Sequence, residues 1–126
     1  MKIVYVCSPL RGDIEVNIRN AREYCRKTVA MGFIPIAPHT IYTEYLDDRE
    51  PAQRRQGLLI GLELLQKCDE LWAFGTVTSE GMDKEIELAR EYGIPVYRID
   101  EPDNPLNYPG GCHISSEIFS LAPVWQ

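Results

Sequence analysis

Glu85 places a charge where its predicted helix requires an apolar side chain. Residues 79–92 have the spacing of an amphipathic helix, and at about 100° per residue one arc of it carries five apolar side chains: Met82, Ile86, Leu88, Ala89 and Tyr92. Glu85 falls inside this arc, whereas the other charged residues of the segment spread over the opposite side. Because burying an unpaired carboxylate is costly, such a residue has a partner, a raised pKa or a chemical task. The plainer interpretation is that Glu85 lies at the margin of the apolar stripe and reaches solvent or an arginine.

Two short segments could bind an anion or a sugar hydroxyl. Residues 8–12 provide the hydroxyl of Ser8, the guanidinium of Arg11, backbone N–H groups and a glycine, Gly12, at which a ligand can approach closely. Ser79 begins the helix discussed above, where it could cap the helix, bind an anion or do both. The alternatives are a plain strand-to-helix turn with Arg11 in solvent, and repulsion of a phosphate by the acidic residue that follows Ser79.

Strands and helices that alternate along the chain must position these residues. Apolar runs predict strands at residues 2–7, 33–37, 70–74 and 94–99, and helical spacing predicts helices at residues 13–32, 51–68 and 79–92. We expect the second helix to place Leu58, Leu62 and Leu65 on its inner face. This alternation indicates an α/β fold in three layers, a parallel sheet with helices on both faces, of the flavodoxin-like or Rossmann-like kind.

Ligands of such sheets bind beyond the carboxyl ends of the strands, which favours three loops: residues 8–13, 38–48 and 75–81. Glu85 follows the third of these loops by one helical turn. Its carboxylate should therefore point near the mouth of a site at this edge of the sheet.

Length and composition indicate one domain that acts on a small molecule. The 126 residues suit a single domain, with a core at residues 1–99 and a Pro/Gly-rich C-terminal arm at residues 100–126. A net charge of −6 argues against a general binder of polymeric nucleic acid or of membrane surfaces. The four cysteines form no C-x-x-C pair, and the sequence begins with a strand pattern rather than a signal peptide, so we expect a reduced, cytoplasmic protein.

Metal binding and a cysteine nucleophile have little support. The two histidines, His39 and His113, lack a second ligand at the spacing that completes a metal set, so we expect neither a metal nor a cofactor. Cys112 and His113 could form a nucleophile and its base, but adjacent residues of a strand or turn point apart. Asp47 and Asp48 are most simply solvated loop residues, kept in consideration by their place after the second strand.

Four motifs resemble the nucleoside 2-deoxyribosyltransferases and the related deoxynucleoside 5′-monophosphate N-glycosidases, and most closely a group of small bacterial and phage domains of that superfamily. The motifs are CSPLRG at 7–12, IPIAPH at 34–39, CDELW at 68–72 and SEGM at 79–82. The resemblance to the group of small domains covers residues 2–99. In the characterised enzymes one helix carries a serine, a glycine two residues later and a glutamate six residues later, as Ser79, Gly81 and Glu85 do here.

The resemblance implies that Glu85 attacks the anomeric carbon of a nucleoside or nucleotide, that a covalent glycosyl intermediate forms as the base leaves, and that Ser79 meets a phosphate. It also implies a homo-oligomer, as is common among these relatives. Together with the three loops, it predicts the following substrate-binding residues: Ser8, Pro9, Leu10, Arg11, Gly12, His39, Tyr42, Asp47, Ser79, Gly81 and Met82.

The chain departs from the characterised enzymes at Gly61. Those enzymes carry an aspartate eight residues before the acidic residue that opens the third strand, and here that count, made from Asp69, reaches Gly61. Asp69, Asp47 or Asp48 could supply the missing carboxylate, and we name Asp69 with Glu85 as the catalytic candidates. The alternative is a non-catalytic domain of the same fold that binds or senses a nucleotide-derived ligand.

Overall fold

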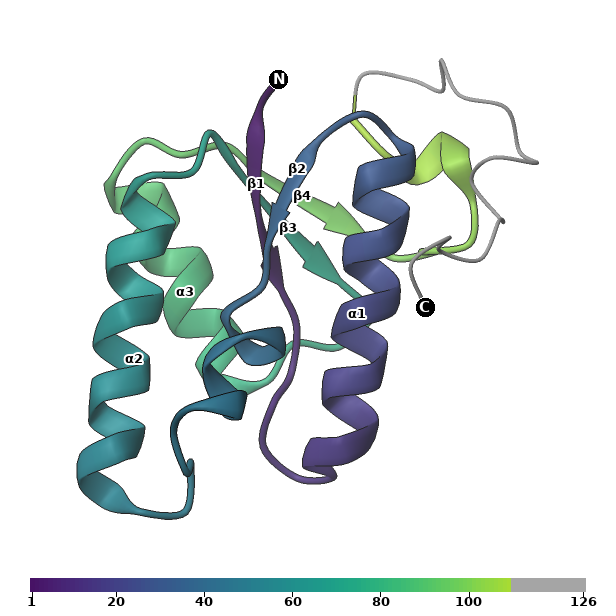
Figure 1. Cartoon of the computed structure of the whole chain (residues 1–126). Helices are drawn as coiled ribbons and strands as arrows, with labels where there is room; N and C mark the ends of the chain where they lie inside the picture. The colour runs from purple at the N-terminus through teal and green to yellow at the C-terminus, as the bar shows by residue number, and fades with distance from the viewer. Residues whose placement is uncertain (110–126) are drawn as a thin grey trace.

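The computed structural model describes residues 1–109 as a four-stranded parallel sheet covered by three helices (Figure 1). The elements follow one another in the order β1 (Ile3–Cys7), α1 (Ile14–Ala30), β2 (Ile34–Ile36), α2 (Pro51–Gln66), β3 (Glu70–Phe74), α3 (Glu80–Glu91) and β4 (Val96–Ile99). The strand order is β2-β1-β3-β4, and every pairing is parallel. The predicted α/β fold with three layers is confirmed.

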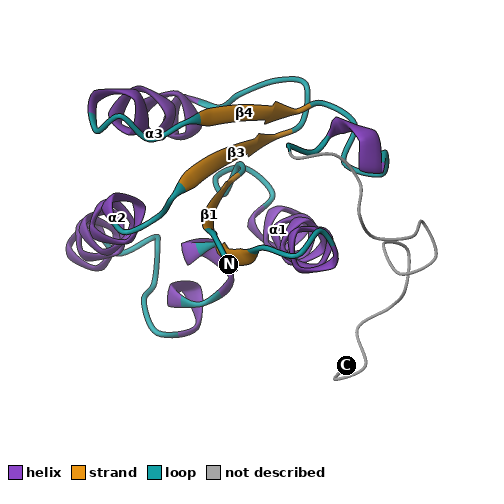
Figure 2. Cartoon of the chain, turned by 90° about the horizontal axis from the view of Figure 1, so that it is seen from above, coloured by secondary structure: helices purple, strands orange, loops and turns teal. Residues whose placement is uncertain are grey.

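The sheet is buried on both faces because α1 covers one of them and α2 and α3 cover the other (Figure 2). Alternate residues of a strand point to opposite faces. On β1, Val4 and Val6 therefore join the cluster under α1, whereas Tyr5 and Cys7 join the cluster under α2 and α3. This alternation decides which side chains of β1 can reach α3.

Each of the three helices begins at a residue whose side chain caps it, at the edge of the sheet where the strands end. Asp13 accepts a hydrogen bond from the backbone N–H of Val16, Glu50 accepts two from the first turn of α2, and Ser79 accepts one from Met82. Each cap satisfies N–H groups that the helix itself leaves unpaired. The caps thereby fix where α1 and α3 begin relative to the loops after β1 and β3.

One expectation about α2 is wrong. Of the three leucines that we placed on its inner face, Leu65 is buried, whereas Leu58 is 58% exposed and Leu62 is 36% exposed. The buried side of α2 instead carries Gly61 and Leu65, and the glycine lets the helix approach β1 closely. The helix has leucines on several sides, so its spacing alone could not identify the buried face.

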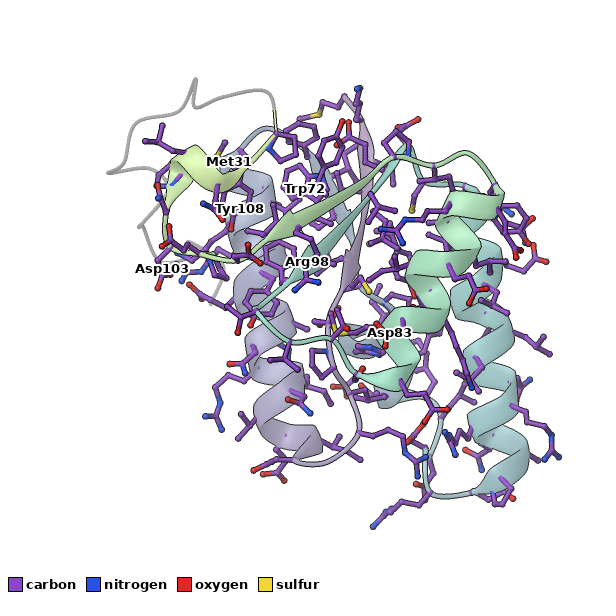
Figure 3. The ribbon with its side chains drawn as sticks, turned by 180° about the vertical axis from the view of Figure 1, so that it is seen from behind. Met31, Trp72, Asp83, Arg98, Asp103 and Tyr108 are labelled. Atoms are coloured by element: carbon purple, nitrogen blue, oxygen red, sulfur yellow. The ribbon has the colours of Figure 1, made fainter. Side chains whose placement is uncertain are left out.

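The first part of the predicted C-terminal arm packs on the α1 side of the sheet. Tyr108 is buried, its ring centroid lies 5.4 Å from that of Trp72, and its hydroxyl donates to the carbonyl of Pro102 (Figure 3). A short 3₁₀ helix, η3 (Pro105–Asn107), leads into this tyrosine. Residues 110–126 of the predicted arm, which include the Cys112–His113 pair, lie outside the described residues.

Among the helices of residues 1–109, none is both long enough and apolar enough to cross a lipid bilayer. In the same range, no three side chains of histidine, cysteine, aspartate or glutamate gather as a metal site would require.

Candidate functional site

Glu85 lies on the side of α3 that faces β1, and its carboxylate is held by two side chains of that strand. The hydroxyl of Tyr5 donates a hydrogen bond to Oε2, and the Sγ atom of Cys7 lies 3.7 Å from Oε1. Glu85 is half-buried, and its neighbours on the helix, Met82 and Ile86, are buried. Within the part of the chain that the structure describes, the carboxylate therefore lies neither in bulk water nor in an ion pair.

These surroundings bring the pKa of Glu85 into the neutral range. Burial disfavours the charged form and raises the pKa from its usual 4.5 to about 7, although the hydrogen bonds from Tyr5 and Cys7 act in the opposite direction. Burial and the charge of Glu85 also raise the pKa of the Tyr5 hydroxyl well above its ordinary value. Tyr5 thus remains a proton donor in its hydrogen bond, while Glu85 exchanges between its two protonation states near pH 7.

Tyr5 and Cys7 are functional candidates that the sequence analysis did not identify. They are far from Glu85 along the chain, but they alternate on one face of β1, so both reach α3. A sequence signal existed, because a hydroxyl and a thiol occur two residues apart in an otherwise aliphatic strand. Only the pairing of β1 with β3 and the position of α3 show that both groups meet Glu85.

Removal of the Tyr5 hydroxyl should raise the pKa of Glu85. In Tyr5→Phe the ring still fills its place in the core, but the carboxylate loses a hydrogen bond that lowers its pKa, so the value should rise above about 7. A titration of the side-chain carboxyl carbon of Glu85 by NMR in both proteins would measure this. Tyr97→Phe, which alters a partly exposed tyrosine of β4, is the control. An unchanged or lower value in Tyr5→Phe would contradict this account of the pair.

A small cavity of about 70 Å³ lies between the loop after β1, the segment after β2 and the N-terminal half of α2. Three of the predicted substrate-binding residues line it: Leu10, His39 and Tyr42. Asp48, which we considered as a source of the missing carboxylate, also lines it. The remaining lining residues were not among our candidates: Pro38, Thr43, Leu46, Gln53, Arg54, Gly57 and Leu58. Glu85, Tyr5 and Cys7 are not among the lining residues, so the carboxylate and the cavity are separate features.

His39 joins the loops after β1 and β2. Its Nε2 atom lies 3.0 Å from the carbonyl oxygen of Ser8, within hydrogen-bonding distance. Burial lowers the pKa of His39 below its usual 6.5, because the charged imidazolium is disfavoured there. A neutral imidazole with Nε2 protonated can donate to Ser8, which fixes one wall of the cavity.

Gly61 connects the cavity to the Tyr5–Glu85 pair. A Cβ atom at this position would lie 3.4 Å from the hydroxyl oxygen of Tyr5 and 4.0 Å from Cγ of Pro38, which lines the cavity. A side chain at position 61 would therefore project between Tyr5, which holds Glu85, and Pro38, which lines the cavity. This chain has no acidic group at position 61, where the resemblance implies one.

The loop after β1 brings most of its predicted residues to the edge where the strands end. Ser8 is buried, and its Oγ has no hydrogen-bond partner within residues 1–109, so this hydroxyl is an unsatisfied polar group at the edge of the sheet. The side-chain amide of Asn17 donates to the carbonyls of Leu10 and Arg11, at 2.9 and 3.0 Å, and fixes the turn. Gly12 adopts a φ of +100°, which favours glycine. Pro9 is half-buried and Arg11 extends into solvent.

The loop after β3 supplies the start of α3. Oγ of Ser79 accepts a hydrogen bond from the backbone N–H of Met82 at 3.2 Å, so Ser79 serves as the N-cap. A Cβ atom at Gly81 would lie 4.0 Å from that oxygen, and Met82 is buried beneath it. The guanidinium of Arg98 donates to the carbonyl of Gly75 and ties this loop to β4 (Figure 3).

Two predicted aspartates do not join this group. Asp69 precedes β3, at the edge of the sheet opposite the three loops, where its Oδ2 accepts a hydrogen bond of 2.7 Å from the backbone N–H of Ile3. The carboxylate of Asp69 therefore links the N-terminal ends of β1 and β3. It does not lie near Glu85, where it could supply the acidic group that Gly61 lacks. Asp47 is exposed and bonds to Arg49, whereas its neighbour Asp48 lines the cavity.

Residues 2–99 of the sequence match a family described as Domain of unknown function (DUF7768). The chain belongs to this family. Among curated proteins, no sequence matches this DUF7768 chain.

Solved structures show that the DUF7768 chain has the fold of 2-deoxyribosyltransferases. The 2-deoxyribosyltransferase from Bacillus psychrosaccharolyticus superimposes with a TM-score of 0.59 and 16% identity, over 76% of this chain and 70% of its own. The 2-desoxiribosyltransferase from Leishmania mexicana gives a TM-score of 0.57 and 13% identity, over 91% and 79% of the two chains. A conserved protein from Enterococcus faecalis V583 gives 0.55 and 22%, over 78% and 62%. The predicted resemblance is confirmed for the fold.

Proposed function

We propose that this protein cleaves the N-glycosidic bond of a nucleoside or nucleotide, or exchanges its base, with Glu85 as the nucleophile. The observation that carries the proposal is the half-buried carboxylate of Glu85, held by the hydroxyl of Tyr5 and given a pKa of about 7. A carboxylate that is poorly solvated at neutral pH is a stronger nucleophile than one in water. The likeness of the fold to two 2-deoxyribosyltransferases supports a substrate of this class.

The reaction requires two displacements at the anomeric carbon. In the first, an oxygen of the ionised Glu85 bonds to C1′, the bond from C1′ to the base nitrogen breaks, and its electron pair leaves with the base, which takes a proton. In the second, water or another base bonds to C1′, loses its proton and frees the carboxylate. Tyr5 holds Oε2 by a hydrogen bond, whereas Oε1 has only the longer contact with Sγ of Cys7, so Oε1 is the oxygen more available for attack.

The test is incubation of the purified protein with a panel of ribonucleosides, deoxyribonucleosides and their 5′-monophosphates, followed by chromatography of the released bases. One substrate should yield free base, or an exchanged nucleoside when a second base is present. Because the ionised form of Glu85 is the nucleophile, kcat/KM should rise with pH through about 7 and then level off. A full panel without base release would reject the proposal.

Gly61 favours a second candidate, a domain that binds a nucleotide-derived ligand without turning it over. Position 61, next to the Tyr5 hydroxyl, carries no side chain, so it supplies no acid to protonate a leaving base. This alternative predicts that one compound of the same panel raises the melting temperature saturably while no base appears. Failure of every compound to change the melting temperature would count against it.

A further inference from the structure

The thiol of Cys7, at the end of β1, lies between two acceptors of α3. Its Sγ atom is 3.7 Å from Oε1 of Glu85 and 3.9 Å from the backbone carbonyl oxygen of Met82. Both contacts are long, as expected of the weak donor that a thiol is, and a carbonyl has two lone pairs, so it can accept from a second donor. A thiol has a single proton. Because Cys7 is fully buried, that proton is shared between these two acceptors rather than with solvent.

The protonation state of Glu85 decides which acceptor the thiol can use. Oε2 of the carboxyl group already accepts a hydrogen bond from the hydroxyl of Tyr5. When Glu85 takes up a proton, that proton therefore belongs on Oε1, which is the oxygen beside Cys7. Two hydrogens cannot occupy the line between Sγ and Oε1, so the thiol has to turn its own proton away. The carbonyl of Met82 is within its reach.

Cys7 keeps its own proton on both sides of neutral pH. Burial raises the pKa of this thiol well above its ordinary value, and the charge of Glu85 acts in the same direction. Two more charges act on the thiol: Arg98 on β4 favours its ionised form, whereas Asp83 on α3 opposes that form. Cys68 belongs to the same core cluster, but its thiol donates to a carbonyl of α2. The thiol of Cys7 is therefore a neutral donor whether Glu85 is charged or not.

We propose that Cys7 is a positioning residue for Glu85: its thiol donates to Oε1 of the ionised carboxylate and turns to the carbonyl of Met82 when Glu85 is protonated. With Tyr5 on Oε2, the ionised carboxylate is then held at both oxygens, which fixes its rotation. Because a thiol is a weak donor, it orients Oε1 and leaves most of the negative charge on it. The advantage for catalysis rests on the proposed function, whereas the exchange of acceptors does not.

The infrared S–H stretching band of Cys7 tests the exchange of acceptors. The chain has other cysteines, so the band is taken as the difference between spectra of the wild type and Cys7→Ala at each pH. It should move to lower frequency as the pH rises through about 7, because a carboxylate is a stronger acceptor than an amide carbonyl. The same difference measured in a Glu85→Gln background should not change with pH. A band that ignores pH in the wild type, or that moves equally in Glu85→Gln, would overturn the proposal.

A titration of the Glu85 carboxyl carbon by NMR tests the positioning role. In Cys7→Ala, Oε1 loses its donor, so the pKa of Glu85 should rise above about 7, by less than in Tyr5→Phe because the thiol is the weaker donor. Cys68→Ala is the matched control, since it removes a buried thiol from the same core cluster without touching Glu85. It should leave the pKa unchanged. An equal shift in the two alanine variants would assign the effect to packing and reject the role of Cys7.

Activity measurements separate this inference from the proposed function. With a substrate from the panel, the rise of kcat/KM with pH in Cys7→Ala should occur at a higher pH than in the wild type, displaced by the shift that NMR measures. A displacement of a different size would contradict the positioning role. Absence of any substrate would reject the proposed function, but the infrared and NMR results would still decide whether Cys7 holds Glu85.

Discussion

Glu85→Gln should abolish base release from whichever compound of the panel is turned over, lowering kcat by at least about 10³-fold. Glutamine keeps the size and the hydrogen-bond acceptor that meets the Tyr5 hydroxyl, so the site should still form, but a neutral amide oxygen is a poor nucleophile toward C1′. Initial rates measured by chromatography of the free base give the comparison. Intact mass after rapid acid quench should show a pentosyl adduct on the wild type and none on Glu85→Gln.

Glu87→Gln is the matched control for this prediction. Glu87 lies on the same helix, is exposed, and should lose no activity when its charge is removed. If the wild type released base and Glu85→Gln released it equally fast, Glu85 would have no part in the chemistry. That result would leave the proposed reaction without its nucleophile.

The second large effect of Glu85→Gln is on stability. The variant that loses activity should be more stable than the wild type. At pH 8, Glu85→Gln should have a free energy of unfolding higher than that of the wild type by roughly 3 kcal/mol, which is the cost of ionising a group whose pKa is about 7 in the folded protein and 4.5 when unfolded. Denaturation by urea at pH 8 and at pH 4 measures the difference.

The sign follows from the raised pKa. The folded protein binds the proton of Glu85 more tightly than the unfolded chain does, so this group contributes stability below pH 4.5 that is lost as the pH rises through about 7. At pH 4 the wild type and Glu85→Gln should therefore differ little, since both side chains are neutral. A difference of the same size at both pH values would show that packing, rather than charge, separates the two proteins.

The fold could be predicted because local patterns and the tertiary structure agree. The strands at residues 2–7 and 70–74 are continuous apolar runs, as expected of buried parallel strands, and the structure has β1 and β3 there within one residue. Glu85 could be singled out for a related reason: α3 has a well-defined apolar arc, so a charge inside it stands out.

The contacts of the candidate site could not be predicted in the same way. The hydrogen bond between Tyr5 and Glu85 joins residues that are 80 positions apart, and it depends on which face of β1 meets α3. The exposure of Leu58 and Leu62 was mispredicted because α2 carries apolar side chains on several sides. The side that packs on the sheet is the one with Gly61, since the glycine allows a close approach to β1. Asp69 looked suitable by residue type, but its place before β3 assigns it to the other end of the sheet.

Tyr108 has a bearing on where this domain ends. The sequence match to the family stops at residue 99, yet Tyr108 covers the indole of Trp72 and is itself only 3% exposed. A protein truncated at the family boundary would lose this cover over Trp72 and part of the core behind β1, the strand that carries Tyr5 and Cys7. We therefore expect shortened versions of the protein to need Tyr108 for full stability, although it lies beyond the stretch by which the family is recognised.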